Sequence, residues 1–245
     1  MFDAHCHAGF APNGADVARQ AQAAGLGLFS CTVEPQAYAA DRRAFAAFPC
    51  VRVGLGLHPW QVRAGAAGAA QVEAFCAQAA GARFIGEVGL DFGRAHADTR
   101  EAQTSAFAAA MEAASGGFHV VSIHAVGAAS SVLDVLERTG ALDANACIFH
   151  WFSGTSDELA RARRAGCYFS VGARMLATRR GREYARQLPP ERLLVETDLP
   201  STAGERLEYH SYQNQIDDTY EQLVRLHGPE TRDAIDRTAR ELFGQ

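Results

Sequence analysis

The sequence predicts an α/β fold, a (β/α)8 TIM barrel in which eight parallel strands alternate with helices. Two observations support this prediction. Eight short apolar runs, each bounded by turn residues, recur along the 245 residues, as expected for strands that are buried on both faces. Segments with helical signals separate most of these runs. The alternative, an open doubly wound sheet, usually carries a Gly-rich phosphate-binding turn after an early strand, and the sequence has none.

The alternation continues from one end to the other with no linker and no internal repeat, so we expect a single domain over residues 1–245. The expected strands are residues 1–6, 26–33, 51–57, 83–89, 119–124, 147–151, 167–171 and 193–197. Helices are expected over residues 16–24, 35–48, 155–166, 175–187, 212–227 and 230–243, and another after residue 98. The patterns Asp98-x-x-Glu101 and Thr155-x-x-Glu158 both match a capping box. The Ala-rich stretch 64–70 is interpreted as a loop and the start of a helix.

Composition is that of an ordinary globular protein, with 48% hydrophobic residues and a net charge of −5. No apolar run reaches the roughly 20 residues that span a bilayer, and the N-terminus lacks the basic and apolar regions of a secretory signal. Six scattered cysteines without a Cys-x-x-Cys pair indicate reduced thiols and a cytoplasmic protein. We expect no membrane contact, and no obligate protein partner is evident.

Charge also limits the function. A net charge of −5 argues against a protein that coats nucleic acid, but not against a nuclease, because bound cations and a local Arg cluster can reverse the sign of one cleft. All 23 basic residues are Arg. The absence of Lys excludes Schiff-base catalysis and a carboxylated lysine as a metal bridge.

Candidate functional residues gather at the expected strand ends, where (β/α)8 barrels carry their active sites. Five of the nine histidines and two carboxylates stand there: His5, His7, His58, Glu87, His124, His150 and Asp198. Residues two apart on a strand point to the same side, so His5 and His7 can converge on one point. A lone histidine is more often structural than a ligand, but core packing does not explain this set.

The number of these residues predicts two divalent ions. His5, His7, a bridging Glu87 and Asp198 can hold the first ion, and Glu87, His124 and His150 the second. The mixed nitrogen and oxygen donors suit Zn²⁺ or Mn²⁺, with Mg²⁺ also possible. Two ions about 3.5–4 Å apart suit hydrolysis of a phosphodiester.

The motifs around these residues resemble those of the TatD family of metal-dependent deoxyribonucleases, among the amidohydrolase-like barrels. The matching stretches, in order, are Asp3-Ala4-His5-Cys6-His7, Gly56-Leu57-His58-Pro59, Gly86-Glu87-Val88-Gly89-Leu90-Asp91, His150-Trp151-Phe152-Ser153-Gly154 and Glu196-Thr197-Asp198-Leu199-Pro200. The resemblance implies metal ligands at His5, His7, Glu87, His124, His150 and Asp198, with Glu87 and Asp198 as catalytic residues. Asp198 is then the general base for the attacking water. Asp91 is expected either to bond a ligand histidine or to cap its loop.

The substrate contacts depart from the family. The fifth-strand motif of the family is His-x-Arg, whereas this chain has His124-Ala125-Val126, which removes a candidate phosphate contact. We expect substrate contacts from His58, Trp151 and Arg174, the last in an Arg-rich segment over 174–186. Trp60, Phe92 and Trp151 are expected either to stack on bases or to pack at the rim.

Three functions follow as hypotheses. The first is a metal-dependent phosphodiesterase that trims DNA, with single strands as the expected substrate. The second is an amidohydrolase-type hydrolase of a small lactone, amide or phosphoester, which the valine at position 126 keeps open. The third is a non-catalytic partner subunit, which the complete ligand set argues against.

Overall fold

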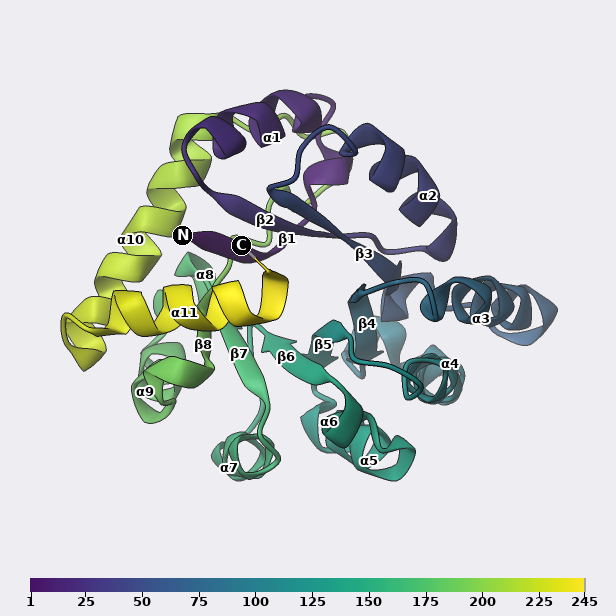
Figure 1. Cartoon of the computed structure of the whole chain (residues 1–245). Coiled ribbons are helices and arrows are strands. Elements are labelled where there is room, and N and C mark those ends of the chain that lie inside the picture. The colour runs from purple at the N-terminus through teal and green to yellow at the C-terminus, as the bar shows by residue number, and fades with distance from the viewer. Residues whose placement is uncertain (245) are drawn as a thin grey trace.

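Eight parallel strands close into one barrel, in the order of the chain. The computed structural model describes residues 1–244. The strands are β1 (Phe2–Cys6), β2 (Gly27–Cys31), β3 (Val51–Leu57), β4 (Phe84–Asp91), β5 (Val120–Val126), β6 (Ala146–His150), β7 (Tyr168–Val171) and β8 (Leu193–Val195). Pairing of Asp3 with Val195 joins β1 to β8 and closes the barrel. The TIM barrel predicted from the alternation is therefore confirmed (Figure 1).

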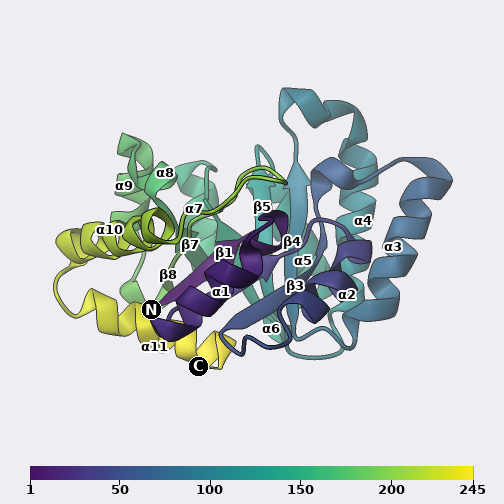
Figure 2. The same ribbon diagram turned by 90° about the horizontal axis from the view of Figure 1, so that it is seen from above.

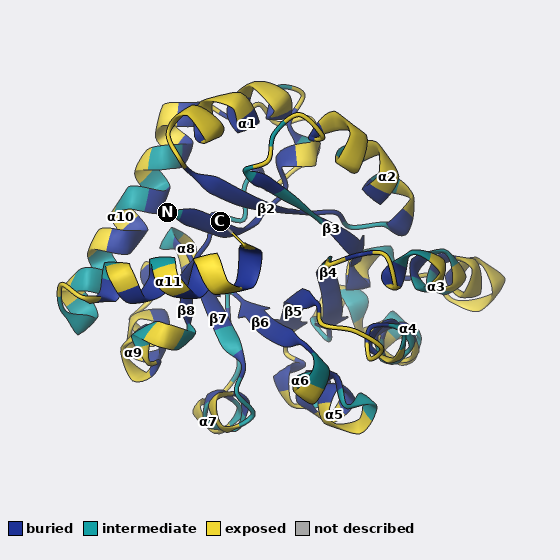
Figure 3. Cartoon of the chain, viewed as in Figure 1, coloured by how far each residue is buried: buried dark blue, intermediate teal, exposed yellow. Residues whose placement is uncertain are grey.

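Helices surround the strands and cover their outer faces (Figure 1). They are α1 (Gly14–Ala23), α2 (Pro35–Ala44), α3 (Gly65–Ala79), α4 (Arg100–Ala113), α5 (Ala129–Thr139), α6 (Ala141–Ala144), α7 (Ser156–Arg164), α8 (Ala173–Leu176), α9 (Arg179–Gln187), α10 (Tyr209–His227) and α11 (Thr231–Phe243). Short 3-10 turns occur at η1 (Ala8–Phe10), η2 (Pro59–Gln61), η3 (Arg94–Thr99) and η4 (Pro190–Arg192). Figure 3 shows the strands mostly buried, while the helices turn one buried face inward.

Three local predictions need correction. The capping box at Asp98 is wrong, because Asp98 lies inside η3 and α4 begins after Thr99 with no side-chain cap. The helix expected over 175–187 is two helices, since α8 ends at Leu176 and the hydroxyl of Thr178 accepts a hydrogen bond from Gly181 N–H at the start of α9. The helix α5 was not expected at all. Thr155 and Glu158, by contrast, form the predicted capping box of α7.

The amino-terminal end of the barrel is closed by α11. The ring of Phe243 stacks on Phe2 at 4.1 Å between centroids and lies close to Phe29 and Phe84. Arg52 fixes this end by donating from Nε to the Phe243 carbonyl oxygen at 2.8 Å. Figure 2 shows α11 beside both termini at this end of the barrel. The chemistry of the molecule is thus left to the opposite end, where the strands finish.

All six cysteines within residues 1–244 are free, as the sequence predicted. Among the same residues, no helix combines the length and the apolar character that a bilayer crossing requires.

The carboxylate of Glu158 links α7 to α5. It accepts hydrogen bonds from the N–H groups of Thr155 at 2.7 Å and Ser130 at 2.9 Å, and from both of their hydroxyls. Partial burial alone raises the pKa of Glu158, but these donors hold it below its ordinary value.

Replacement of Glu158 by alanine is expected to lower the free energy of unfolding by about 1 kcal/mol at pH 7, since it removes this cap. The depressed pKa sets the sign of the pH dependence. The contribution is present above the ordinary pKa of a glutamate and fades as the pH falls through the lower folded-state pKa. Urea unfolding of both proteins at pH 7 and pH 3 measures the effect. As the control, Glu183→Ala removes an exposed carboxylate of α9 that pairs only with Arg186 and should change nothing measurable. A loss as large at pH 3 as at pH 7 would contradict the assignment to the ionised carboxylate.

Candidate metal centre

Seven side chains converge at the carboxyl end of the barrel. The list is the one expected from the strand ends: His5 in β1, His7 just after it, His58 after β3, Glu87 in β4, His124 in β5, His150 at the end of β6 and Asp198 after β8. Six of them are at least nine-tenths buried in side-chain terms, and Asp198 is 20% exposed. The fold therefore brings together residues from six strands.

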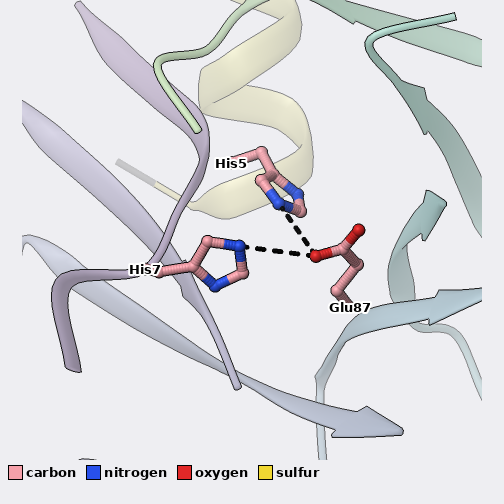
Figure 4. A group of neighbouring side chains, drawn as sticks. All are labelled: His5, His7 and Glu87. Carbon is pink, nitrogen blue, oxygen red and sulfur yellow. Dashed lines mark ion pairs between the residues drawn. The ribbon is translucent and has the colours of Figure 1, made fainter. Parts of the chain in front are cut away.

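One oxygen of Glu87 faces the first strand. Its Oε2 lies 3.4 Å from Nε2 of His5 and 3.4 Å from Nε2 of His7. Figure 4 shows both rings pointing to this oxygen. Asp198 Oδ1 approaches the same two nitrogens, at 3.8 Å and 3.5 Å. These distances leave room for a cation between the donors instead of direct hydrogen bonds.

The other oxygen of Glu87 faces three further imidazoles. Its Oε1 lies 2.8 Å from His124 Nδ1, 2.8 Å from His150 Nε2 and 3.2 Å from His58 Nε2. The ring of His150 stacks on His5, with centroids 4.0 Å apart, so the two groups of donors adjoin. Each oxygen of one carboxylate therefore faces a different set of nitrogens.

Outer hydrogen bonds determine which ring nitrogens carry a lone pair. His7 Nδ1 donates to the carbonyl oxygen of Cys31 at 3.0 Å, so the neutral form of this ring turns its unprotonated Nε2 towards the carboxylates. His5 Nδ1 lies 2.6 Å from Ser122 Oγ, and its Nε2 is buried with no hydrogen-bond partner among the described residues. The Nε2 atoms of His5 and His7 are therefore the ones that would bind a cation.

His58 differs in which of its ring nitrogens carries the proton. The backbone N–H of Trp60 donates to His58 Nδ1 at 3.1 Å, so the proton of the neutral ring is on Nε2 and faces Glu87. His58 can complete a donor group with Glu87 and His124, but only after losing this proton. Its geometry therefore favours a hydrogen-bond donor at the edge of the cluster.

The electrostatics of the cluster follow from burial and mutual pairing. Burial alone raises the pKa of Glu87, but the surrounding His58, His150 and His5 hold it well below its ordinary value. Burial and the nearby His150 lower the pKa of His5 to about 4, so this ring is neutral at pH 7. Burial also lowers the pKa of His7, but Asp198 and Glu87 outweigh it and raise the pKa to about 10. Positive charge is stabilised beside both carboxylates, which is where a cation belongs.

Two site residues have left-handed backbones, Trp151 at φ +39° and Asp198 at φ +57°. Such conformations are costly for non-glycine residues and are found where the surroundings enforce them. Asp198 N–H donates to the His5 carbonyl oxygen at 2.9 Å, and Trp151 N–H donates to Glu196 Oε1 at 3.1 Å. Gly89 serves close packing, because a Cβ at its φ of +139° would lie 2.1 Å from the His124 carbonyl oxygen.

Glu196 and Asp3 are buried carboxylates beside the candidate ligands that the strand-end argument missed. Glu196 is buried, accepts a hydrogen bond from the Ser170 hydroxyl, and lies 3.7 Å from His150 Nδ1. Asp3 accepts from Thr197 Oγ1 and from Tyr212 Oη, both at 2.6 Å. The sequence held a signal for both residues, because Glu196 stands two residues before Asp198 and Asp3 stands two residues before His5. Asp91 does both things expected of it: its Oδ2 lies 3.2 Å from His124 Nε2, and its Oδ1 caps Gly93 N–H.

The donor set fits divalent cations. Imidazoles and carboxylates surround a common centre, and their ligand atoms form three groups within 4.8 Å. The unpartnered Nε2 of His5 inside a polar cluster is satisfied once a cation is bound. The chain therefore has groups able to hold metal.

A cleft of about 470 Å³ opens over these groups. Its apolar lining includes Phe10, Val33, Trp60 and Val126, from the ends of β1, β2, β3 and β5, and Trp151 and Arg174 line it from the ends of β6 and β7. Arg174 Nη1 lies 3.7 Å from Asp198 Oδ2, and its guanidinium lies 5.7 Å from the centre of the Trp151 ring. All three expected substrate contacts, His58, Trp151 and Arg174, thus line the cleft.

Three other arginines of the Arg-rich segment bond locally. Arg180 donates to the Ser153 carbonyl oxygen, Arg182 to the Leu176 carbonyl oxygen, and Arg186 to Glu183. Arg174 is therefore the segment's contribution to the cleft.

Comparison with known proteins gives a consistent result. The family model described as TatD related DNase matches residues 2–244. Over 120 residues, 47% of this chain, the sequence is 37% identical to the 3'-5' ssDNA/RNA exonuclease TatD of Enterobacter lignolyticus, and over 116 residues it is 29% identical to Deoxyribonuclease Tat-D of Schizosaccharomyces pombe. These matches span 45% and 37% of the relatives' own lengths.

Solved structures share the fold over the whole chain. The TatD homologue YjjV of Escherichia coli superposes with a TM-score of 0.82 at 22% identity, covering 100% of this chain and 98% of its own. A TatD family hydrolase of Entamoeba histolytica gives 0.78 at 15% identity, covering 99% and 97%. With the family model matched from the second residue to the last described one, this chain belongs to the TatD related DNase family.

Proposed function

We propose that this protein is a divalent-metal-dependent phosphodiester hydrolase that trims single-stranded DNA from an end. The observation that carries the proposal is Glu87, whose two oxygens face separate sets of imidazoles beneath an open cleft. The names of the relatives, which include 3'-5' ssDNA/RNA exonuclease, support a nucleic acid as substrate and indicate the 3' end as the point of attack.

The proposed metal ligands are those expected from the sequence. His5, His7, Glu87 and Asp198 would hold one ion, and Glu87, His124 and His150 a second, with Zn²⁺, Mn²⁺ or Mg²⁺ as the candidates. When bound, these ions supply Lewis acidity that lowers the pKa of water and neutralises charge at phosphorus.

Asp198 is the proposed general base. Although burial raises the pKa of its carboxyl, His7 and His5 hold that pKa below its usual range, so the group is ionised at neutral pH. Its side chain is 20% exposed and lines the cleft, within reach of a water on the substrate side. Arg174, at 3.7 Å from Asp198 Oδ2, is positioned to bind a phosphate oxygen next to the attacked phosphorus. His58 Nε2–H can donate to a further oxygen.

Arg174 also offers a replacement for the arginine that the family motif has at the position of Val126. Val126 is 39% exposed and lines the cleft, so no cation reaches the substrate from the end of β5. Arg174 lines the same cleft from the end of β7, so phosphate binding is proposed to move to the β7 side. Family membership and the relatives' names favour this reading over hydrolysis of a small lactone or amide.

A direct assay tests the proposal. Metal-loaded protein is incubated with a 5'-labelled single-stranded DNA ladder, the matched duplex and a panel of lactones and amides. We expect stepwise shortening of the single strands, slower attack on the duplex and no turnover of the small compounds. Turnover of a lactone with intact DNA would refute the proposal.

A further inference from the structure

Trp60 is exposed and yet held in one orientation. Its side chain is 57% exposed, the largest value among the exposed large apolar residues of 1–244, and it lines the cleft. Its ring stacks on His96 with centroids 5.2 Å apart and planes 14° from parallel, and its Nε1–H donates to Asp91 Oδ2 at 2.6 Å. A fixed aromatic surface loses little conformational entropy when a ligand covers it.

The indole adjoins the candidate metal centre. The centres of the His58 and His124 rings lie 4.9 Å and 5.9 Å from that of Trp60. Val33 and Val126 add apolar surface to the same cleft, and Arg174 lines it from the end of β7, four strands around the closed barrel from β3, which Trp60 follows. A ligand that fits this cleft has a flat apolar ring that contacts Trp60 and an anionic group that contacts Arg174. The part of the ligand that joins them lies over the metal donors.

Other exposed aromatic surface in the molecule differs. Phe118 is 50% exposed but lies before β5, at the far end of the barrel, beneath the guanidinium of Arg83 at 4.3 Å. The Phe92 ring faces the guanidinium of Arg100 at 5.1 Å and is not among the residues that line the cleft. Of these three residues, Trp60 is the one that is exposed, held in one orientation and next to the candidate metal ligands.

We infer that Trp60 is a stacking platform for the base of the nucleotide adjoining the scissile phosphate, with that phosphate directed to Arg174. The inference rests on the proposed function and adds the substrate class of its end-binding site: a nucleotide that carries a base, whichever base it is. Stacking is tolerant of sequence because every base has a π-face.

Equilibrium binding tests the inference without requiring turnover. The probes are two phosphorothioate tetranucleotides, which resist hydrolysis, one with a normal 3'-terminal nucleotide and one with an abasic residue there. With the metal-loaded wild type, we expect the abasic probe to bind about 5- to 150-fold more weakly, the range for one base stacked on an aromatic side chain. The ratio should fall towards one in Trp60→Ala and persist in Trp60→Phe, which keeps a ring but loses the bond to Asp91. Phe118→Ala, the control for an exposed aromatic, should keep the wild-type ratio.

Fluorescence gives a second readout, because the chain has two tryptophans, Trp60 and Trp151. The base-bearing probe should quench the emission of the wild type more than that of Trp60→Phe, and the abasic probe should quench both alike. Equal binding of the two probes by the wild type, an unchanged ratio in Trp60→Ala, or no binding of either probe would overturn the inference. Base-dependent binding without cleavage of unmodified DNA would retain the stacking platform and refute the proposed hydrolysis. Cleavage of unmodified DNA without base-dependent binding would support the proposed hydrolysis and refute the stacking platform.

Discussion

Replacement of Glu87 by glutamine is expected to lower kcat for DNA hydrolysis by about a thousandfold, equal to about 4 kcal/mol in the barrier. The amide keeps the shape of the side chain but loses the charge that faces His5 and His7 on one oxygen and His124 and His150 on the other. Neither group of donors then has its shared anionic ligand, so metal content should fall together with the rate. Single-turnover kinetics and metal analysis of the purified variant measure the two effects.

The matched control is Glu112→Gln, which changes an exposed carboxylate on α4. It should keep the wild-type rate and metal content. Circular dichroism separates loss of the site from loss of the fold. A folded Glu87→Gln protein with full metal content and near wild-type kcat would remove Glu87 from the centre of the site.

Replacement of Asp198 by asparagine is the second large effect, with an expected fall in kcat of about 10²- to 10⁴-fold at saturating metal. The amide cannot take the proton of the attacking water, whereas the fold retains the bond from the residue 198 N–H to the His5 carbonyl oxygen. Because Glu87, His5 and His7 remain, metal should still bind, though more weakly. Rates measured across a metal titration distinguish lost base catalysis from lost affinity.

Asp134→Asn is the control for this variant, since Asp134 pairs with Arg161 on the surface of α5. Its kcat should be that of the wild type. Recovery of the wild-type rate by Asp198→Asn at high metal concentration would show that Asp198 serves only as a ligand.

The barrel and its donor set could be predicted because both leave local signals. A strand buried on both faces is a short apolar run, as in β5, and its last residues lie at the functional end whatever the helices do. His124 and Glu87 could therefore be assigned to one rim before any contact was known. The helix boundaries were less predictable, because side-chain caps such as Thr178 on Gly181 compete with continuous helix in the same sequence.

The contacts that tune the site could not be predicted, because they join residues far apart in the chain. Ser122 lies 117 positions from the His5 that it contacts, and the Cys31 carbonyl that orients His7 is 24 positions away. No spacing rule relates such pairs. The same holds for the hydrogen bond that places a proton on His58 Nε2, which depends on the turn after β3 bringing Trp60 N–H back to the ring.

The residues that line the cleft were the least predictable part of the site. Trp60 was expected either to stack on bases or to pack at the rim, and only its measured exposure and its bond to Asp91 favour the first. Val126 marked the loss of an arginine, but nothing in the sequence located the replacement cation. The place of Arg174 against Trp151 and Asp198 results from the short α8 turn directly after β7.

The most direct test of the account is a crystal structure of the Mn²⁺-loaded protein with anomalous diffraction at the metal edge. The account predicts two peaks, one at each oxygen of Glu87, the first beside His5, His7 and Asp198 and the second beside His124 and His150. A single peak that does not touch Glu87, or no peak at this end of the barrel, would contradict it.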